Sequence, residues 1–122
     1  MNKKIIIETA ILNDGKLILE TEEKINGLIP AEQILVDSDH NSFIYLMENQ
    51  EEYTYIVLPE QLWSYLKTAI EQKVTVFLKA EHEQIELPNF LDELEYVLSN
   101  IKGNSNYGNE LVTKVEGFFL SV

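Results

Sequence analysis

The sequence predicts an α+β fold: a mainly antiparallel sheet with about three helices, two of them packed together at the C-terminus. Strand-type runs rich in β-branched and aromatic residues dominate the first 58 positions, and helical apolar stripes follow. The order is strands, a helix, a hairpin and then two helices, which favours α+β over a doubly wound parallel sheet. With 122 residues, 45% of them hydrophobic, we expect one globular domain over residues 1–122.

The first two strands are expected at 5–12 and 16–22. Asp14-Gly15 between them supplies the positive φ angles of a tight hairpin. Alternation predicts that one face of the first strand carries Ile5, Ile7, Thr9 and Ile11. Residues 24–31 contain Asn-Gly and a proline and are interpreted as a loop. Further strands are expected at 33–36, 43–48 and 53–58.

Three helices are expected in the second half of the chain. Pro59 starts the first, whose apolar stripe is Leu62, Leu66, Ala69 and Ile70. A hairpin at 74–79 and 84–87 follows. Asn89 caps the second helix and Gly103 ends it. The stripe of this second helix is Phe90, Leu94, Val97, Leu98 and Ile101, and the third helix carries Leu111, Val112, Val115 and Phe119.

Composition excludes several classes of site. The chain has no cysteine, which removes disulfides, thiolate metal sites and cysteine nucleophiles. No apolar run approaches the roughly 20 residues of a membrane span, and we expect a soluble, cytoplasmic protein with no membrane contact. The formal net charge is −12, and the nine basic residues form no patch, so we expect no nucleic-acid binding.

Two polar motifs and one strand pair carry a family resemblance. They are Gln33-Ile34-Leu35-Val36-Asp37-Ser38-Asp39, the segment from Phe43 to Tyr55, and Ile101-Lys102-Gly103-Asn104-Ser105-Asn106-Tyr107-Gly108. Over nearly the whole chain, the sequence resembles the YjbL-like family of small uncharacterised Firmicutes proteins. The resemblance implies a bacterial, cytoplasmic, single-domain protein and assigns no functional residue.

The spacing of Asp37, Asp39, Asn41 and Glu48 matches positions 1, 3, 5 and 12 of a calcium loop of the EF-hand type. Ser42 stands where that loop needs glycine, however, and the flanking segments are predicted strands. Turn chemistry explains the same residues without a metal. The only histidines, His40 and His82, are expected in solvated loops. We therefore predict no metal and no cofactor.

A small ligand-binding protein or enzyme is the alternative function that the polar loops suggest. Its site would combine Asp37 and Asp39 with Asn104, Asn106 and Tyr107. A structural role in reversing the chain direction is favoured for the second loop, because Gly and Asn tolerate left-handed backbone geometry. Catalytic signatures are missing, which favours a non-enzymatic role.

The leading hypothesis is a small binding or adaptor protein that acts through protein–protein contacts. Both faces of the strand pair 43–47 and 53–58 are apolar, and the contact residues expected there are Tyr45, Tyr53 and Tyr55. One face packs on the helices. The other is covered by the chain's own helices or by a second copy or protein partner, and the sequence leaves these alternatives open.

The charge gives a first prediction. At physiological salt the protein is expected not to bind DNA or RNA, because a surface of net charge −12 repels phosphates. Fluorescence anisotropy with labelled single- and double-stranded oligonucleotides tests this. Tight binding that weakens as salt rises would contradict it.

Overall fold

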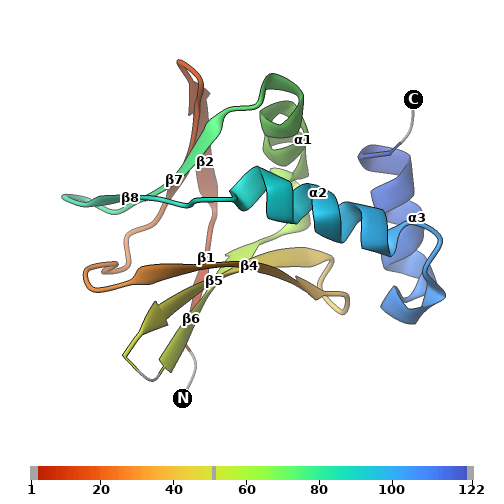
Figure 1. The fold of residues 1–122 in the computed structure, drawn as a ribbon, viewed down its shortest axis with the longest axis horizontal. Coiled ribbons are helices and arrows are strands. Elements are labelled where there is room, and N and C mark those ends of the chain that lie inside the picture. The colour runs from red at the N-terminus through yellow and green to blue at the C-terminus, as the bar shows by residue number, and fades with distance from the viewer. Residues whose placement is uncertain (1–2, 51, 121–122) are drawn as a thin grey trace.

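The computed structural model describes residues 3–50 and 52–120, whose strands form two four-stranded sheets (Figure 1). Sheet A has the order β1 (Lys3–Ile6), β6 (Glu52–Leu58), β5 (Ser42–Asn49) and β4 (Ile29–Asp37). Sheet B has the order β2 (Thr9–Asn13), β3 (Lys16–Glu20), β7 (Thr75–Lys79) and β8 (Gln84–Glu86). The α+β class is confirmed. Among the described strands, only the β1–β6 and β3–β7 pairings are parallel.

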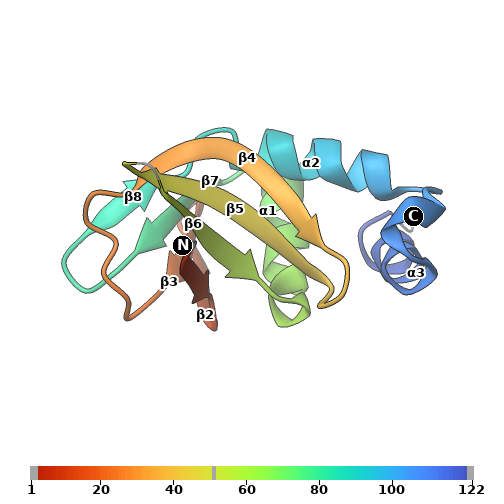
Figure 2. The same ribbon diagram turned by 90° about the horizontal axis from the view of Figure 1, so that it is seen from below.

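The expected helices form, and the stripe of the second is buried as predicted, whereas Ile70, Val112 and Phe119 of the other two stripes are half-buried. The helices are α1 (Trp63–Gln72), α2 (Phe90–Ile101) and α3 (Asn109–Phe118), with short 3₁₀ turns η1 (Glu60–Leu62) and η2 (Ser105–Tyr107). Pro59 is extended and precedes η1, so α1 begins one turn later than expected. Helix α3 lies beside the end of α2, far from β8 (Figures 1 and 2). None of the described helices is long and apolar enough to cross a membrane.

The first predicted strand is wrong in one respect, because the chain changes sheets within it. Ile5 and Ile7 are buried as expected, but Thr9 and Ile11 are exposed and Ala10 is buried. The single run 5–12 is two strands, β1 in sheet A and β2 in sheet B. The inward-facing set shifts by one residue after Ile7, because each half packs its own sheet against the shared core.

Strand β4 begins earlier than expected and absorbs the end of the predicted loop. It starts at Ile29, and its pairing with β5 shifts between Pro30 and Ile34. Glu32 within this irregularity has a φ of 56°. A bulge of this kind allows a proline and a residue with left-handed backbone geometry within a strand. In the sequence, the same residues are typical of a loop.

An aromatic cluster joins sheet A to two helices within the core. The ring centroids of Phe43 and Trp63 lie 5.8 Å apart, and those of Trp63 and Phe119 lie 5.2 Å apart. These rings come from β5, α1 and the end of α3, so three segments distant in sequence share one packed unit.

Tyr45 also lies in this core and is fully buried. Its ring stacks on Phe90 at a centroid distance of 5.5 Å, and its hydroxyl donates a 2.8 Å hydrogen bond to the Pro88 carbonyl. Burial, together with the nearby negative charge of Glu32, raises the pKa of Tyr45 well above its usual range. The tyrosine thus stays neutral and ties β5 to the start of α2.

Helix α2 begins and ends at the predicted residues, but the contact made by Asn89 at its start differs from the expected one. Gly103 adopts a φ of 67° just after the helix, as a C-terminal stop requires. Asn89 occupies the N-cap position in a left-handed conformation, but its side chain makes no capping hydrogen bond. It donates instead to the Glu32 carboxylate of the β4 bulge. The amide therefore connects α2 to sheet A.

The packing of α2 can be tested by truncation. Leu94, Leu98, Leu111, Val115 and Phe90 are all buried, as predicted. Leu94→Ala is expected to lower the free energy of unfolding by about 2–5 kcal/mol, because it leaves a cavity in the core. Chemical denaturation measures this. The matched control is Tyr96→Ala on the exposed side of α2, where the side chain is 63% exposed and the cost should stay within about 0.5 kcal/mol. Equal effects of the two changes would contradict the packing.

Tyr45 gives a pH-dependent prediction. Its pKa is raised in the folded state, so its stabilising effect is complete below the unfolded pKa of about 10 and falls as pH rises above it. Below pH ~10, Tyr45→Phe should cost about 0.5–1.5 kcal/mol through the lost hydrogen bond. Above it, the advantage of the wild type should shrink by up to about 1.4 kcal/mol per pH unit. A difference that does not change with pH would count against a buried neutral tyrosine.

Candidate functional site

The first predicted polar loop is a short turn held by its own side chains. Asp37 and Ser42 pair across the β4–β5 hairpin, with four residues between them. The Asp37 carboxylate contacts the His40 ring nitrogen Nδ1 at 2.9 Å, and the Ser42 hydroxyl donates to the His40 carbonyl at 3.0 Å. These contacts are those of turn chemistry.

The residues with calcium-loop spacing do not converge. Glu48 lies near the other end of β5, where it pairs with Ile29 and Tyr53. At a strand rise of about 3.3 Å per residue, it is roughly 20 Å from the turn. No group of three or more His, Cys, Asp or Glu side chains within 3–50 and 52–120 is arranged to hold a metal ion. His40 and His82 are also separate, because the β4–β5 and β7–β8 turns lie at opposite ends of the molecule (Figure 2).

The first predicted polar loop contacts the helix that follows the second one. The Asn41 side-chain amide donates to the Glu110 carboxylate at 3.0 Å, which joins the β4–β5 turn to the first turn of α3. The loop that precedes α3 satisfies itself: Asn104 accepts from the backbone N–H of Asn106 at 3.1 Å, and Tyr107 packs half-buried on the core. These contacts tie the β4–β5 turn to α3 and fold the second loop onto the core.

Three cavities lie elsewhere. One of about 220 Å³ lies between the start of β7 and the segment 86–92, and one of about 350 Å³ lies among α1, α2 and Phe119–Leu120. The largest, about 1030 Å³, is a groove along β1. None of the three is lined by Asp37, Asp39 or residues 104–107.

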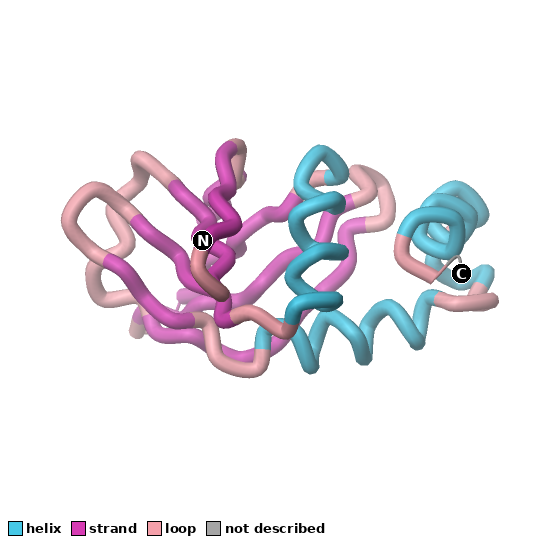
Figure 3. The backbone as a smooth tube through the Cα atoms, turned by 90° about the horizontal axis from the view of Figure 1, so that it is seen from above, coloured by secondary structure: helices cyan, strands magenta, loops and turns pink. Residues whose placement is uncertain are grey.

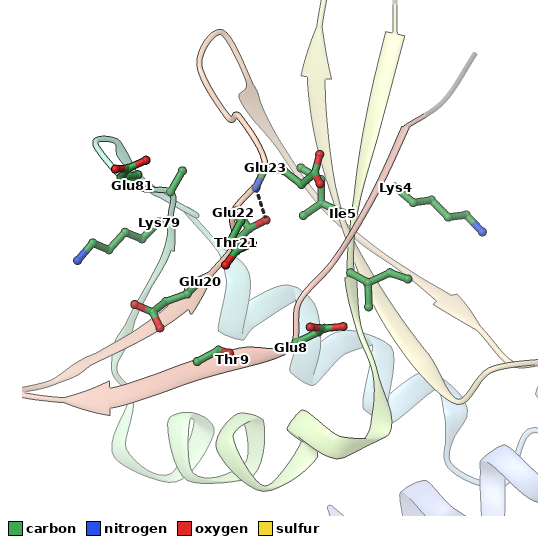
Figure 4. Close-up of a pocket in the computed structure, with 12 residues that line it drawn as sticks. Lys4, Ile5, Glu8, Thr9, Glu20, Thr21, Glu22, Glu23, Lys79 and Glu81 are labelled. Carbon is green, nitrogen blue, oxygen red and sulfur yellow. Dashed lines mark hydrogen bonds between the residues drawn. The ribbon is translucent and has the colours of Figure 1, made fainter.

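We call the largest cavity the β1 groove (Figure 4). One wall is Lys4, Ile5 and Ile6, its end is formed by Glu8 and Thr9, and the far wall is formed by residues 20–23 and 79–81. Five carboxylates line it: Glu8, Glu20, Glu22, Glu23 and Glu81. Only two ammonium groups, Lys4 and Lys79, line it as well, so the groove is acidic. Sequence reasoning missed it because its walls come from separate segments and carry no motif.

A second feature is the face of sheet A that points away from the core, which we call the outer face. In Figure 2 the strands β4, β5 and β6 lie toward the viewer with α1 behind them, and Figure 3 shows α1 on the near side from the opposite direction. The centre of the outer face is a small apolar cluster made only of strand residues: Ile44, Leu46, Val57, Ala31, Leu35 and Tyr55. More exposed apolar residues surround that cluster: Ile6 at 59%, Ile29 at 61% and Tyr53 at 43% exposed.

The predicted tyrosines divide between the two faces of the strand pair. Tyr53 and Tyr55 lie on the outer face, because they pair with Glu48 and Leu46 there. Tyr45 pairs with Ile56 on the core face and is fully buried, so it is not available as a surface contact. Including Tyr45 among the contact residues was wrong, since alternation gives two faces but not which one meets the helices.

Comparison with known proteins identifies the family. Residues 5–119 match the model of a family of unknown function, UPF0738. The UPF0738 protein YjbL of Bacillus subtilis is 43% identical over 98% of this chain and all of its own length. Relatives from Bacillus pumilus and Bacillus cytotoxicus are 42% and 37% identical over the same shares. No solved structure matches the chain. The resemblance found in the sequence is confirmed, and this chain belongs to the UPF0738 family of bacterial proteins.

Proposed function

We propose that this chain is a small binding or adaptor protein that acts through protein–protein contacts made by the outer face of sheet A. The observation that carries the proposal is the apolar character of this face. Its centre is an apolar cluster, and Ile6, Ile29 and Tyr53 extend it with exposed side chains. The central residues Ile44, Leu46 and Val57 are only 7%, 6% and 9% exposed, and the exposed residues lie toward the edges of the face, with Glu48 between Ile29 and Tyr53. Exposed apolar side chains around an apolar centre are typical of interaction sites.

Sheet B supplies a contrast within the same molecule. Its own face away from the core carries charged or hydroxyl side chains in two of its rows, Thr9 with Glu20 and Lys79, and Lys16 with Thr75. A sheet with one wet face shows this mixture. On the outer face of sheet A the central rows are apolar, Ile44 with Val57 and Leu46 with Tyr55. The central row of this face in sheet B, Ile11 with Ile18 and Phe77, is also apolar, so sheet A differs in having two adjacent apolar rows. The wider apolar area supports contact with another molecule at sheet A.

The partner we propose is a different protein rather than a second copy. Two copies of a chain with net charge −12 repel one another, and like charges at a contact oppose association. Tyr53 and Tyr55 suit a contact that forms and dissociates, because tyrosine combines apolar area with a polar tip.

We keep the cytoplasmic location expected from the sequence as part of this proposal.

The alternative of a ligand-binding or catalytic site at the two polar loops has weaker support. The first loop contacts α3 through Asn41 and Glu110, and each loop forms hydrogen bonds within itself. The three cavities lie elsewhere. A binding pocket would need converging groups that face a concavity.

A crosslinking pull-down from the source cells tests the proposal. Tagged wild type is compared with a double variant, Tyr53→Ser and Ile29→Ser, and captured proteins are quantified by mass spectrometry. The double variant is expected to lose at least one protein about tenfold, because exposed apolar anchors carry much of the contact energy. The matched control is Tyr96→Ser, an exposed tyrosine on α2. Identical capture by all three forms, each with an unchanged melting temperature, would refute the proposal.

A further inference from the structure

Strand β1 is an edge of sheet A with free backbone hydrogen-bonding groups. It pairs only with β6. The Ile7 N–H donates to the Val57 carbonyl at 3.0 Å, which fixes the direction of the alternating backbone groups. Ile5 and Ile7 direct their backbone N–H and C=O groups toward β6, so the N–H and C=O groups of Lys4 and Ile6 point away from β6. Within the described residues, neither of these two residues makes a backbone hydrogen bond on that side.

These backbone groups face the β1 groove. The groove runs beside Lys4, Ile5 and Ile6, and its opposite wall is the segment 20–23. It exists because the chain leaves sheet A at Ile7 and the two sheets diverge from there. A space of about 1030 Å³ beside a free edge is large enough for a short extended segment.

The charge of the groove selects the chemistry of that segment. In Figure 4 the Glu23 and Glu8 side chains lie beside β1, whereas Lys4 extends to the side of β1 opposite residues 20–23. Lys3 pairs with Glu23 at 3.4 Å, but both side chains are about half exposed, and exposed pairs of this kind contribute little. Basic side chains of a partner would thus meet an excess of carboxylates.

The pleat of a strand defines the pattern of the partner. Side chains on one face of an added strand would point toward the carboxylates, and those on the other face would lie beside Ile6 and the outer face of sheet A. A second copy of β1 fits poorly, because short lysine-bearing edges oppose self-pairing and would bring Lys3 and Lys4 of each copy together.

We infer that β1 binds an extended segment of a partner protein by strand addition, and that this segment alternates basic with apolar side chains. The inference rests on the proposed function and names the chemistry of its partner. The backbone of β1 provides hydrogen bonds, the glutamates select Lys or Arg, and Ile6 continues the contact onto the outer face.

Peptides test the inference directly. The probe is a fluorescent peptide of about eight residues that alternates Lys and Val. A control of the same composition has its lysines grouped at one end, and a second control is N-methylated at every other residue to block one hydrogen-bonding edge. The alternating peptide is expected to bind about tenfold more tightly than either control and to weaken as salt rises from about 50 to about 300 mM. Equal binding of all three would overturn the inference.

Variants of the protein test whether the peptide binds at β1. Ile6→Pro removes a donor from the free edge and leaves the β6 ladder intact, so binding should fall about tenfold. The double change Glu8→Gln and Glu23→Gln should weaken binding similarly, whereas Glu71→Gln with Glu95→Gln, on α1 and α2, should not. Amide chemical shifts of Lys4 and Ile6 should move on titration. Shifts confined to other strands would overturn the inference, and the N-methylated peptide keeps it testable if Ile6→Pro does not fold.

The proposed function and the strand-addition inference can be refuted independently of each other. Loss of captured proteins in the Tyr53 and Ile29 variant, with no preference among the peptides, would refute strand addition and leave the outer face as the contact. Selective peptide binding at β1, with unchanged capture by that variant, would support the edge and refute the outer face.

Discussion

The fold depends on the change of sheet at Ile7. This residue is fully buried, and its N–H still bonds to Val57 of sheet A. Two residues later the chain is in β2 of sheet B. Because the two sheets share one core, the short crossing restricts their relative position. Burial of Ile5 and Ile7 stabilises this crossing on both sides.

The same crossing generates the candidate interaction surfaces. Leaving sheet A after only four residues makes β1 a short edge strand, and the divergence of the sheets opens the groove beside it. Ile6 has its side chain on the outer face of sheet A and its free backbone groups toward the groove. A partner bound in the β1 groove would thus also contact the outer face. The acidic side chains of the groove and the apolar side chains of the outer face can therefore bind the same partner. Edge strands with free backbone groups invite pairing unless they are protected.

Several local features could be predicted from the sequence, because short-range chemistry decides them. Asp14-Gly15 formed the expected hairpin, Gly103 ended α2, and the stripe from Phe90 to Ile101 is buried. Turn residues and helical periodicity act over a few positions, and they survive in most tertiary contexts. The apolar character of both faces of β5 and β6 was also visible in the sequence, although it did not show which face meets the helices.

The sequence by itself determined the α+β class, the three helices, the acidic surface and the family resemblance. Tertiary structure alone decided the division of 5–12 between two sheets, the bulge at Glu32 and the burial of Tyr45. It also decided the β1 groove, whose walls come from the segments 4–9, 20–23 and 79–81. The physical reason is the sequence separation of the interactions involved. Propensity and periodicity depend on neighbouring residues, whereas the choice of sheet and of buried face depends on packing between residues far apart in the chain.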